Sequence, residues 1–180
     1  MQILGGELKG RKIQVPARIR PVSQRVKKSC FDIISDLLES KTVLDLYAGS
    51  GSLGIEALSR GASRAVFVDK SKTSIKSINN NINSLNLKRN AEIYCKKSSL
   101  AIQYLCRKKT FFDLIFLDPP YYKGLLIKSL QLLESYDILA RSGYLIGFCY
   151  ENDQYAKKYK NFSLIIKKSY GQSDLLIYKK

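Results

Sequence analysis

The chain has 180 residues, 45% of them hydrophobic, and its 31 Lys and Arg against 15 Asp and Glu give a formal net charge of +16. This length and composition predict one folded domain with a single core. No apolar run approaches the ~18 residues of a membrane-spanning helix, and the first residues lack the pattern of a signal peptide, so we expect a cytoplasmic protein. Such a one-sided charge suits a nucleic-acid partner, although drift of the composition towards lysine would also produce it.

The residue types exclude several kinds of chemistry. The sequence contains no histidine, and none of its four cysteines forms a Cys-x-x-Cys pair, so we expect no metal site. The absence of histidine also excludes Ser-His and Cys-His catalytic arrangements. The cysteines are interpreted as small buried hydrophobic side chains in a reducing compartment.

The first forty residues have a different pattern from the rest. Strand-like runs at 2–4 and 11–15, joined by a glycine-rich stretch, predict a hairpin. A basic, proline-bounded segment at 16–21 is expected to be extended or looped. Ser23 is a suitable N-cap, and apolar residues at helical spacing predict a helix from there through about Glu39.

From residue 42 onward, strand-like and helix-like segments alternate. The strand-like runs are Thr42–Tyr47, Arg64–Val68, Ala91–Cys95, Phe112–Leu117 and Tyr144–Tyr150. The helix-like stretches are Leu53–Arg60, Ser71–Leu85, Ser98–Lys108 and Leu125–Leu133. This alternation predicts a parallel sheet covered on both faces, and Phe162–Tyr170 with Ser173–Tyr178 predicts a closing antiparallel hairpin. We therefore divide the chain into an RNA-binding extension, 1–40, and a core, 41–180.

One strand runs directly into a glycine-rich turn and a helix, in the sequence Asp45-Leu46-Tyr47-Ala48-Gly49-Ser50-Gly51. Glycines let the backbone approach a ligand closely, and a helix N-terminus favours polar groups. Asp45 lies inside the strand, where a carboxylate suits the ammonium of a methionine moiety better than a pyrophosphate. Asp69 ends the next strand, at about the spacing of a ribose-binding acid. The alternatives are a plain strand–helix turn and a solvated acid.

The sequence Asp118-Pro119-Pro120-Tyr121 follows the fourth core strand. Two prolines restrict the backbone, so the Asp118 side chain and the Pro119 carbonyl can be presented rigidly as two hydrogen-bond acceptors. These match the two hydrogens of an amino group on a base, and Tyr121 offers an aromatic face for stacking. In isolation Asp-Pro is also a common turn sequence.

These motifs together resemble the class I S-adenosylmethionine-dependent methyltransferases that modify amino groups of bases. Gly10-Arg11, Arg20-Pro21, Arg25-Val26 with Phe31, and Tyr170-Gly171 resemble the RsmD family more narrowly. The resemblance implies a Rossmann-like α/β fold with a seven-stranded, mostly parallel sheet whose last strand is antiparallel. It also implies transfer of a methyl group from S-adenosylmethionine to N2 of guanine 966 in 16S rRNA, within the small ribosomal subunit.

The same resemblance implies three groups of site residues. The acceptor residues would be Asp118, Pro119, Pro120 and Tyr121. The cofactor residues would be Asp45, Tyr47, Ala48, Gly49, Ser50, Gly51, Asp69, Lys70 and Ser98. The phosphate-binding residues would be Lys9, Arg11, Lys12, Arg18, Arg20 and Arg25, and we expect a monomer.

The chain departs from the family pattern at two positions. Gln24 stands where the family typically has Asp, and Ser98 stands where it usually has an acid near the cofactor adenine. Two other functions stay open at this point. A DNA adenine-N6 methyltransferase shares the Asp-Pro-Pro-Tyr chemistry but usually needs a longer chain, and a non-catalytic RNA-binding module would explain only the charge.

Overall fold

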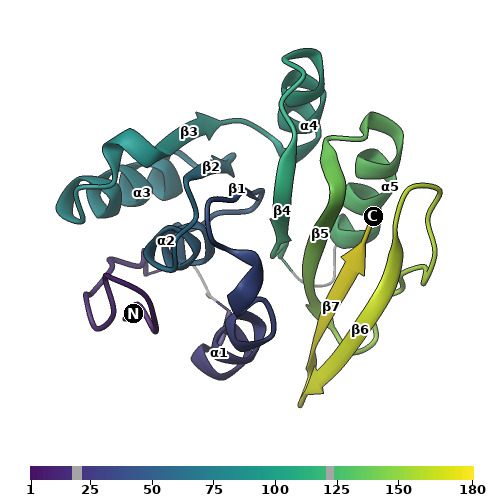
Figure 1. The fold of residues 1–180 in the computed structure, drawn as a ribbon, viewed down its shortest axis with the longest axis horizontal. Helices are drawn as coiled ribbons and strands as arrows, with labels where there is room; N and C mark the ends of the chain where they lie inside the picture. Colours follow the sequence, from purple (N-terminus) through teal and green to yellow (C-terminus); the bar gives the residue numbers. More distant parts are fainter. Residues whose placement is uncertain (18–21, 121–123) are drawn as a thin grey trace.

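The computed structural model describes residues 1–17, 22–120 and 124–180 of the chain. Within them, seven strands form one sheet in the order β3-β2-β1-β4-β5-β7-β6 (Figure 1). The strands are β1 Thr42–Asp45, β2 Arg64–Asp69, β3 Ala91–Cys95, β4 Phe112–Leu117, β5 Leu139–Tyr150, β6 Ser163–Tyr170 and β7 Ser173–Lys179. β1 to β5 pair in parallel, and β7 lies antiparallel between β5 and β6. The predicted sheet, including its antiparallel last strand, is confirmed.

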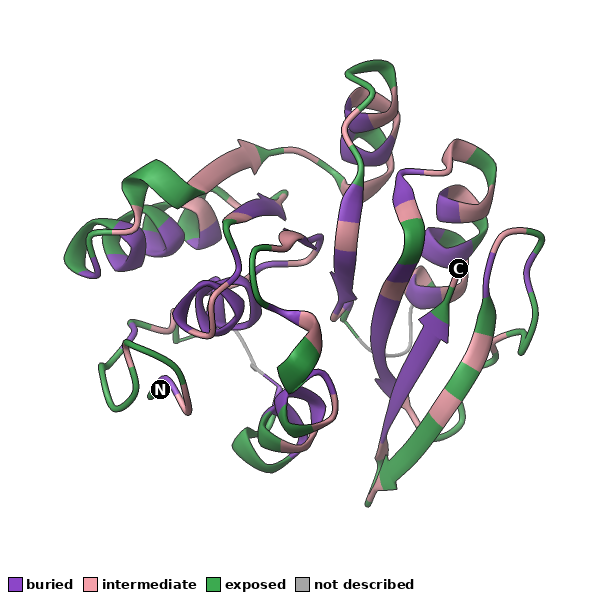
Figure 2. Ribbon diagram, in the orientation of Figure 1, coloured by how far each residue is buried: buried purple, intermediate pink, exposed green. Residues whose placement is uncertain are grey.

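Helices cover both faces of this sheet. They are α1 Gln24–Ile33, α2 Ser52–Ser59, α3 Lys72–Ser84, α4 Ser98–Arg107 and α5 Leu125–Tyr136. Successive strand residues point to opposite faces, so Val43 packs in the cluster with α1, α2 and α3, whereas Leu44 packs in the cluster with α4 and α5. Figure 2 shows the resulting burial of the central strands. This is the two-sided α/β core that the sequence pattern predicts.

The predicted helix through Glu39 is too long. α1 ends at Ile33, and a short 3₁₀ turn, Ser35–Leu37, follows. The Ser35 hydroxyl donates to Asp36 and to the Asp32 carbonyl, and such local bonds compete with continuation of a helix. The predicted N-cap is confirmed, because the Ser23 side chain accepts from the Val26 N–H.

The predicted N-terminal hairpin forms without the two regular strands that the sequence pattern suggests. A single antiparallel bridge joins Gln2 and Lys12, with no regular strand on either side. The backbone of the connecting loop bonds to α2 instead: the Leu4 N–H donates to Glu56, and the Glu7 N–H donates to the Ser59 carbonyl. The extension therefore packs into the same hydrophobic cluster as the core.

A buried ion pair fixes α1 to α2. Lys27 Nζ lies 2.9 Å from Glu56 Oε2, and both side chains are fully buried. Arg60 pairs with the other oxygen of Glu56 and lies 5.2 Å from the centre of the Phe31 ring. Phe31 in turn packs on Phe116 of β4, with ring centres 5.6 Å apart. α1 is thus attached rigidly beside the central strand β4.

The remaining boundaries and burial assignments differ in detail. β5 begins before the predicted residue 144, where a register shift against β4 lets Leu139 pair with Phe112. The expectation that the cysteines are buried is confirmed for Cys30 and Cys149, but wrong for Cys95, which is exposed at the end of β3, and only partly met by Cys106, which is half-buried. Among the described residues, no helix combines the length and apolar character needed to cross a bilayer.

Candidate active site

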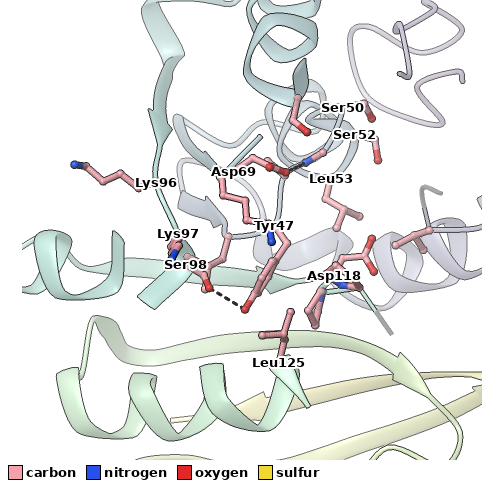
Figure 3. A pocket seen from close by; sticks show the side chains of 18 of the residues that line it. Tyr47, Ser50, Ser52, Leu53, Asp69, Lys96, Lys97, Ser98, Asp118 and Leu125 are labelled. Atoms are coloured by element: carbon pink, nitrogen blue, oxygen red, sulfur yellow. Dashed lines mark hydrogen bonds between the residues drawn. The ribbon is translucent and has the colours of Figure 1, made fainter. Parts of the chain in front are cut away.

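A pocket of about 600 Å³ opens at the carboxyl ends of the parallel strands (Figure 3). This is the edge at which ligands bind in open α/β sheets, and the volume lies in the range of small-molecule sites. Residues at the ends of β1, β2 and β3 line the part where the sequence predicts the cofactor, called the cofactor side below: Tyr47, Ala48, Gly49, Ser50, Asp69, Lys70, Lys96, Lys97, Ser98 and Ser99. The part around the predicted acceptor residue Asp118 is called the acceptor side, and we group with it Val22, Ser23, Pro119, Pro120 and Ser173. Ser52, Leu53, Ser74, Leu46 and Leu125 complete the lining.

The turn between β1 and α2 requires glycine. Gly49 and Gly51 have φ of +56° and +82°, a backbone region that other residues rarely adopt. A Cβ on Gly51 would also come within 3.3–3.4 Å of Ile55, Ile78 and Phe67. The turn therefore lies tight against the core, and its residues Ala48, Gly49 and Ser50 line the pocket.

Asp45 supports this turn from beneath. Its side chain is buried, Oδ2 accepts from the Gly54 N–H at 3.0 Å, and Oδ1 has no partner among the described residues. Burial raises the pKa of Asp45 to about 7, and the bond from Gly54 opposes that shift. Neither Asp45 nor Gly51 is among the residues that line the pocket. A direct contact between Asp45 and a cofactor ammonium thus stays a prediction. The bond from the Gly54 N–H shows that Asp45 stabilises the glycine turn.

Asp69 joins the ends of β1 and β2. Its Oδ2 accepts from the Gly49 N–H at 2.9 Å, and its Oδ1 accepts from the Ser71 N–H at 2.8 Å. The carboxylate is half-buried and lines the pocket beside the glycine turn. Each oxygen keeps a lone pair for a further donor, so the group fits the two hydroxyls of a ribose.

Three hydroxyl groups form a chain at the far end of the cofactor side. Ser98 donates to the Tyr47 hydroxyl at 2.9 Å (Figure 3). The Tyr47 hydroxyl lies 2.7 Å from that of Ser129. Ser98 opens α4, directly after the pocket-lining Lys97. The position expected to meet adenine is thus occupied by a neutral hydroxyl network instead of a carboxylate.

Asp118 lies on the acceptor side, directly after β4. Its side chain is partly open to the pocket but removed from bulk water, and this desolvation, with the nearby Asp45 carboxylate as a smaller cause, raises the pKa of Asp118 to about 8. Pro119 is buried beside it, and Pro120 is exposed. The Tyr121 expected to stack on a base lies outside the described residues.

This geometry agrees with comparisons to known proteins. The family model "Conserved hypothetical protein 95" matches residues 1–179. Ribosomal RNA small subunit methyltransferase D of Buchnera aphidicola is 34% identical over 98% of this chain and 91% of its own length, and its Escherichia coli namesake is 34% identical over 78% and 70%. This chain belongs to the RsmD family. It is accordingly a methyltransferase.

Solved structures support the same assignment for this RsmD-family chain. The Escherichia coli protein YhhF superimposes with a TM-score of 0.87 and 29% identity over 100% of this chain and 97% of its own. A hypothetical protein of Thermus thermophilus gives 0.85 at 26% identity, with 98% of each chain covered. A methyltransferase bound to S-adenosylhomocysteine shares the fold at 16% identity and a TM-score of 0.67.

Four of the six predicted RNA-binding cations lie in the described residues, and none of these four lines the pocket. Lys9, Arg11, Lys12 and Arg25 are not among its lining residues, and Arg11 donates to the carbonyl of Ser84 at the end of α3. Arg18 and Arg20 lie outside the described residues. The RNA-binding roles of all six residues stay predictions.

The pocket also contains residues that the sequence interpretation missed. Lys96 and Lys97 lie on the cofactor side, and Val22, Ser23 and Ser173 lie on the acceptor side. Lys96 and Lys97 directly follow β3, so the rule for carboxyl ends of strands could have found them. Nothing in the sequence points to Ser173. Among the described residues, no three His, Cys, Asp or Glu side chains gather into a metal-binding group.

Proposed function

We propose that this chain transfers a methyl group from S-adenosylmethionine to the exocyclic N2 of a guanine in 16S rRNA, at the position of guanine 966. The observation that carries the proposal is one pocket with a glycine turn and a ribose-type acid on its cofactor side, and Asp118-Pro119 on its acceptor side. The family relatives named as small subunit methyltransferases support the choice of rRNA over other nucleic acids.

The cofactor side fits S-adenosylmethionine, which supplies a methyl group bound to a sulfonium. Asp69 would accept from the ribose hydroxyls, and the backbone of Ala48, Gly49 and Ser50 would lie against the methionine portion. Tyr47 and Ser98 would lie at the adenine. The rigid turn under this portion, fixed by the bonds of Asp45 and Asp69, would place the reactive carbon at one point of the pocket.

The acceptor side would act on the amino group of the base. The lone pair of a guanine N2 is delocalised into the ring, so the nitrogen is a weak nucleophile. The Asp118 carboxylate and the Pro119 carbonyl would accept its two hydrogens, which favours tetrahedral geometry and directs the lone pair at the methyl carbon. As the new N–C bond forms, the bond from the methyl carbon to the sulfonium sulfur would break and leave a neutral thioether, and Asp118 would take the proton that the acidified nitrogen loses.

The wider partner would be the small ribosomal subunit, in the cytoplasm. The net charge of +16 suits its phosphates, and the cations of the N-terminal extension would position the RNA without reading its sequence. We retain the extension at 1–40, the core at 41–180 and the monomeric state as proposals.

Methyl transfer to purified subunits tests this function. Labelled S-adenosylmethionine would be incubated with small subunits that lack the modification, with naked 16S rRNA and with duplex DNA, followed by nucleoside analysis. The expected product is N2-methylguanosine from the subunits. N6-methyladenosine from DNA would identify the alternative methyltransferase, and RNA binding without any methylated product would identify a binding module.

A further inference from the structure

The acceptor side is built from parts that are far apart in the sequence. Val22 and Ser23 precede α1, Asp118 follows β4, and Ser173 opens β7. Figure 1 shows α1, the end of β4 and the tip of the β6–β7 hairpin at the same edge of the sheet. Residues from both ends of the chain thus line the same pocket as Asp118.

A hydrogen bond joins these two ends. The Ser29 hydroxyl in α1 bonds with the hydroxyl of Tyr170, the last residue of β6. Tyr170 is half-buried, and its ring packs against the hydrophobic cluster that contains Phe31. The turn at Gly171 follows immediately, and a Cβ on Gly171 would meet no described atom within 4 Å. The tyrosine thus reaches from the hairpin to α1, while the turn beside it faces open space.

Both partners of this bond have rigid supports. α1 is fixed to β4 by the Phe31–Phe116 contact and to α2 by the buried Lys27–Glu56 pair. The hairpin is fixed because β7 pairs with β5 along its whole length, up to Ser173 opposite Tyr150. The two supports meet in the sheet, but β4 pairs with β5 only as far as Leu117 opposite Gly147, so the end of the hairpin at Ser173 extends beyond β4. The Ser29–Tyr170 bond ties this extending end directly to α1.

We propose that the N-terminal end of α1 and the β6–β7 turn form the entrance for the acceptor nucleotide, and that the Ser29–Tyr170 bond sets its width. The inference rests on the proposed function, because it assigns the entrance to a single unpaired nucleotide of rRNA. Tyr170 is a positioning residue: it acts through Ser23 and Ser173, and it is not among the residues that line the pocket.

Removing either hydroxyl tests the link. Tyr170→Phe and Ser29→Ala should each lower kcat/KM for small subunits by about five- to tenfold, the typical effect of one hydrogen bond. The loss should appear mainly as a higher KM for subunits. The double variant should be no worse than either single variant, because both changes remove the same bond. Affinity for S-adenosylmethionine, measured by calorimetry, should stay within about twofold.

Two variants serve as controls. Tyr144→Phe removes the hydroxyl of another half-buried tyrosine of the sheet, paired with Leu114 near the start of β4 and away from the pocket, and should leave all constants unchanged. Ser29→Thr keeps a hydroxyl and should restore most of the activity that Ser29→Ala loses. Wild-type kinetics in Tyr170→Phe would overturn the proposal, as would single effects that multiply in the double variant or an equal loss of cofactor affinity.

Hydrogen exchange of the protein alone separates this inference from the proposed function. In Tyr170→Phe, the amides at Gly171–Ser173 should exchange at least about fivefold faster, and those near Lys179 should not change. Unchanged exchange at the turn would overturn the link whatever the substrate is. Faster exchange in an enzyme that methylates no rRNA would instead support the link and contradict the proposed function.

Discussion

The two sides of the pocket are constructed in different ways. On the cofactor side, backbone N–H groups of Gly49 and Ser71 already bond to Asp69, and the three strand–helix connections after β1, β2 and β3 supply most of the surface. On the acceptor side, Asp118 lies in a desolvated position that raises its pKa to about 8, and its neighbours come from both ends of the chain. The cofactor side is preorganised locally, whereas the acceptor side depends on long-range packing. Changes to each side should therefore have different consequences.

The largest expected effect is on stability, through the anchor of α1. Glu56→Gln removes the charge that compensates the buried Lys27, whose pKa burial already lowers. Leaving a buried ammonium without its carboxylate should reduce the free energy of unfolding by about 3–5 kcal/mol, measured by urea denaturation. Asp32→Asn, which breaks the exposed Lys28–Asp32 pair, should cost less than about 1 kcal/mol. Equal losses in the two variants would mean that α1 is held by apolar packing alone.

The next effect concerns chemistry on the acceptor side. Asp118→Asn keeps the size of the side chain but removes the anionic acceptor, so single-turnover methyl transfer should fall by about 10²–10³-fold. S-adenosylmethionine affinity should be nearly unchanged, because the residue addresses the acceptor. A variant that keeps more than about a tenth of the wild-type rate would show that Asp118 does not have this role.

On the cofactor side, removal of a carboxylate should weaken the binding of S-adenosylmethionine and should not act through the acceptor base. Asp69→Ala removes a carboxylate that holds the Gly49 N–H and faces the pocket. It should weaken S-adenosylmethionine binding by about 1–3 kcal/mol in calorimetry. The exposed acid Asp36 provides a control, since Asp36→Ala should leave the affinity as it is. If Asp69→Ala binds S-adenosylmethionine with wild-type affinity, Asp69 only stabilises the glycine turn through its bond from Gly49.

The pKa of Asp118 gives the two sides different pH dependence. If the carboxylate form accepts the amino hydrogens, kcat/KM for subunits should rise with pH and level off above about 8, because the protonated form dominates below that value. Between pH 7 and 8 the increase should be about fivefold. Cofactor binding should follow a different profile, because the acid that supports the glycine turn, Asp45, has a pKa of about 7. A flat kcat/KM profile across that interval would argue against titration of Asp118 in the enzyme before it binds the subunit.

The same contrast explains what could be predicted from the sequence. The strand–turn–helix at Asp45–Gly54 and the acid at Asp69 are local patterns with fixed spacing, so sequence alone predicts their place in the fold. Ser173 is 55 positions from Asp118 along the chain, and only the antiparallel pairing of β7 with β5 brings it to the pocket. The predicted N-terminal hairpin is too regular because its backbone groups bond to Glu56 and Ser59 of α2, which no local pattern reveals.

The smallest expected effect distinguishes two groups of cations. Lys97 is exposed at the cofactor side of the pocket, whereas Lys9 lies in the N-terminal loop that packs on α2. Each has no ion-pair partner among the described residues, so each is available to a phosphate. If bound rRNA covers both regions, Lys97→Ala and Lys9→Ala should each weaken subunit binding by a few fold and reduce the slope of log K against log salt by about one.

Lys88→Ala, at an exposed lysine in the short 3₁₀ turn before β3, should leave that slope unchanged. A reduction in Lys97→Ala alone would place the RNA at the pocket rim and remove the N-terminal loop from the interface, and a reduction in Lys9→Ala alone would do the reverse.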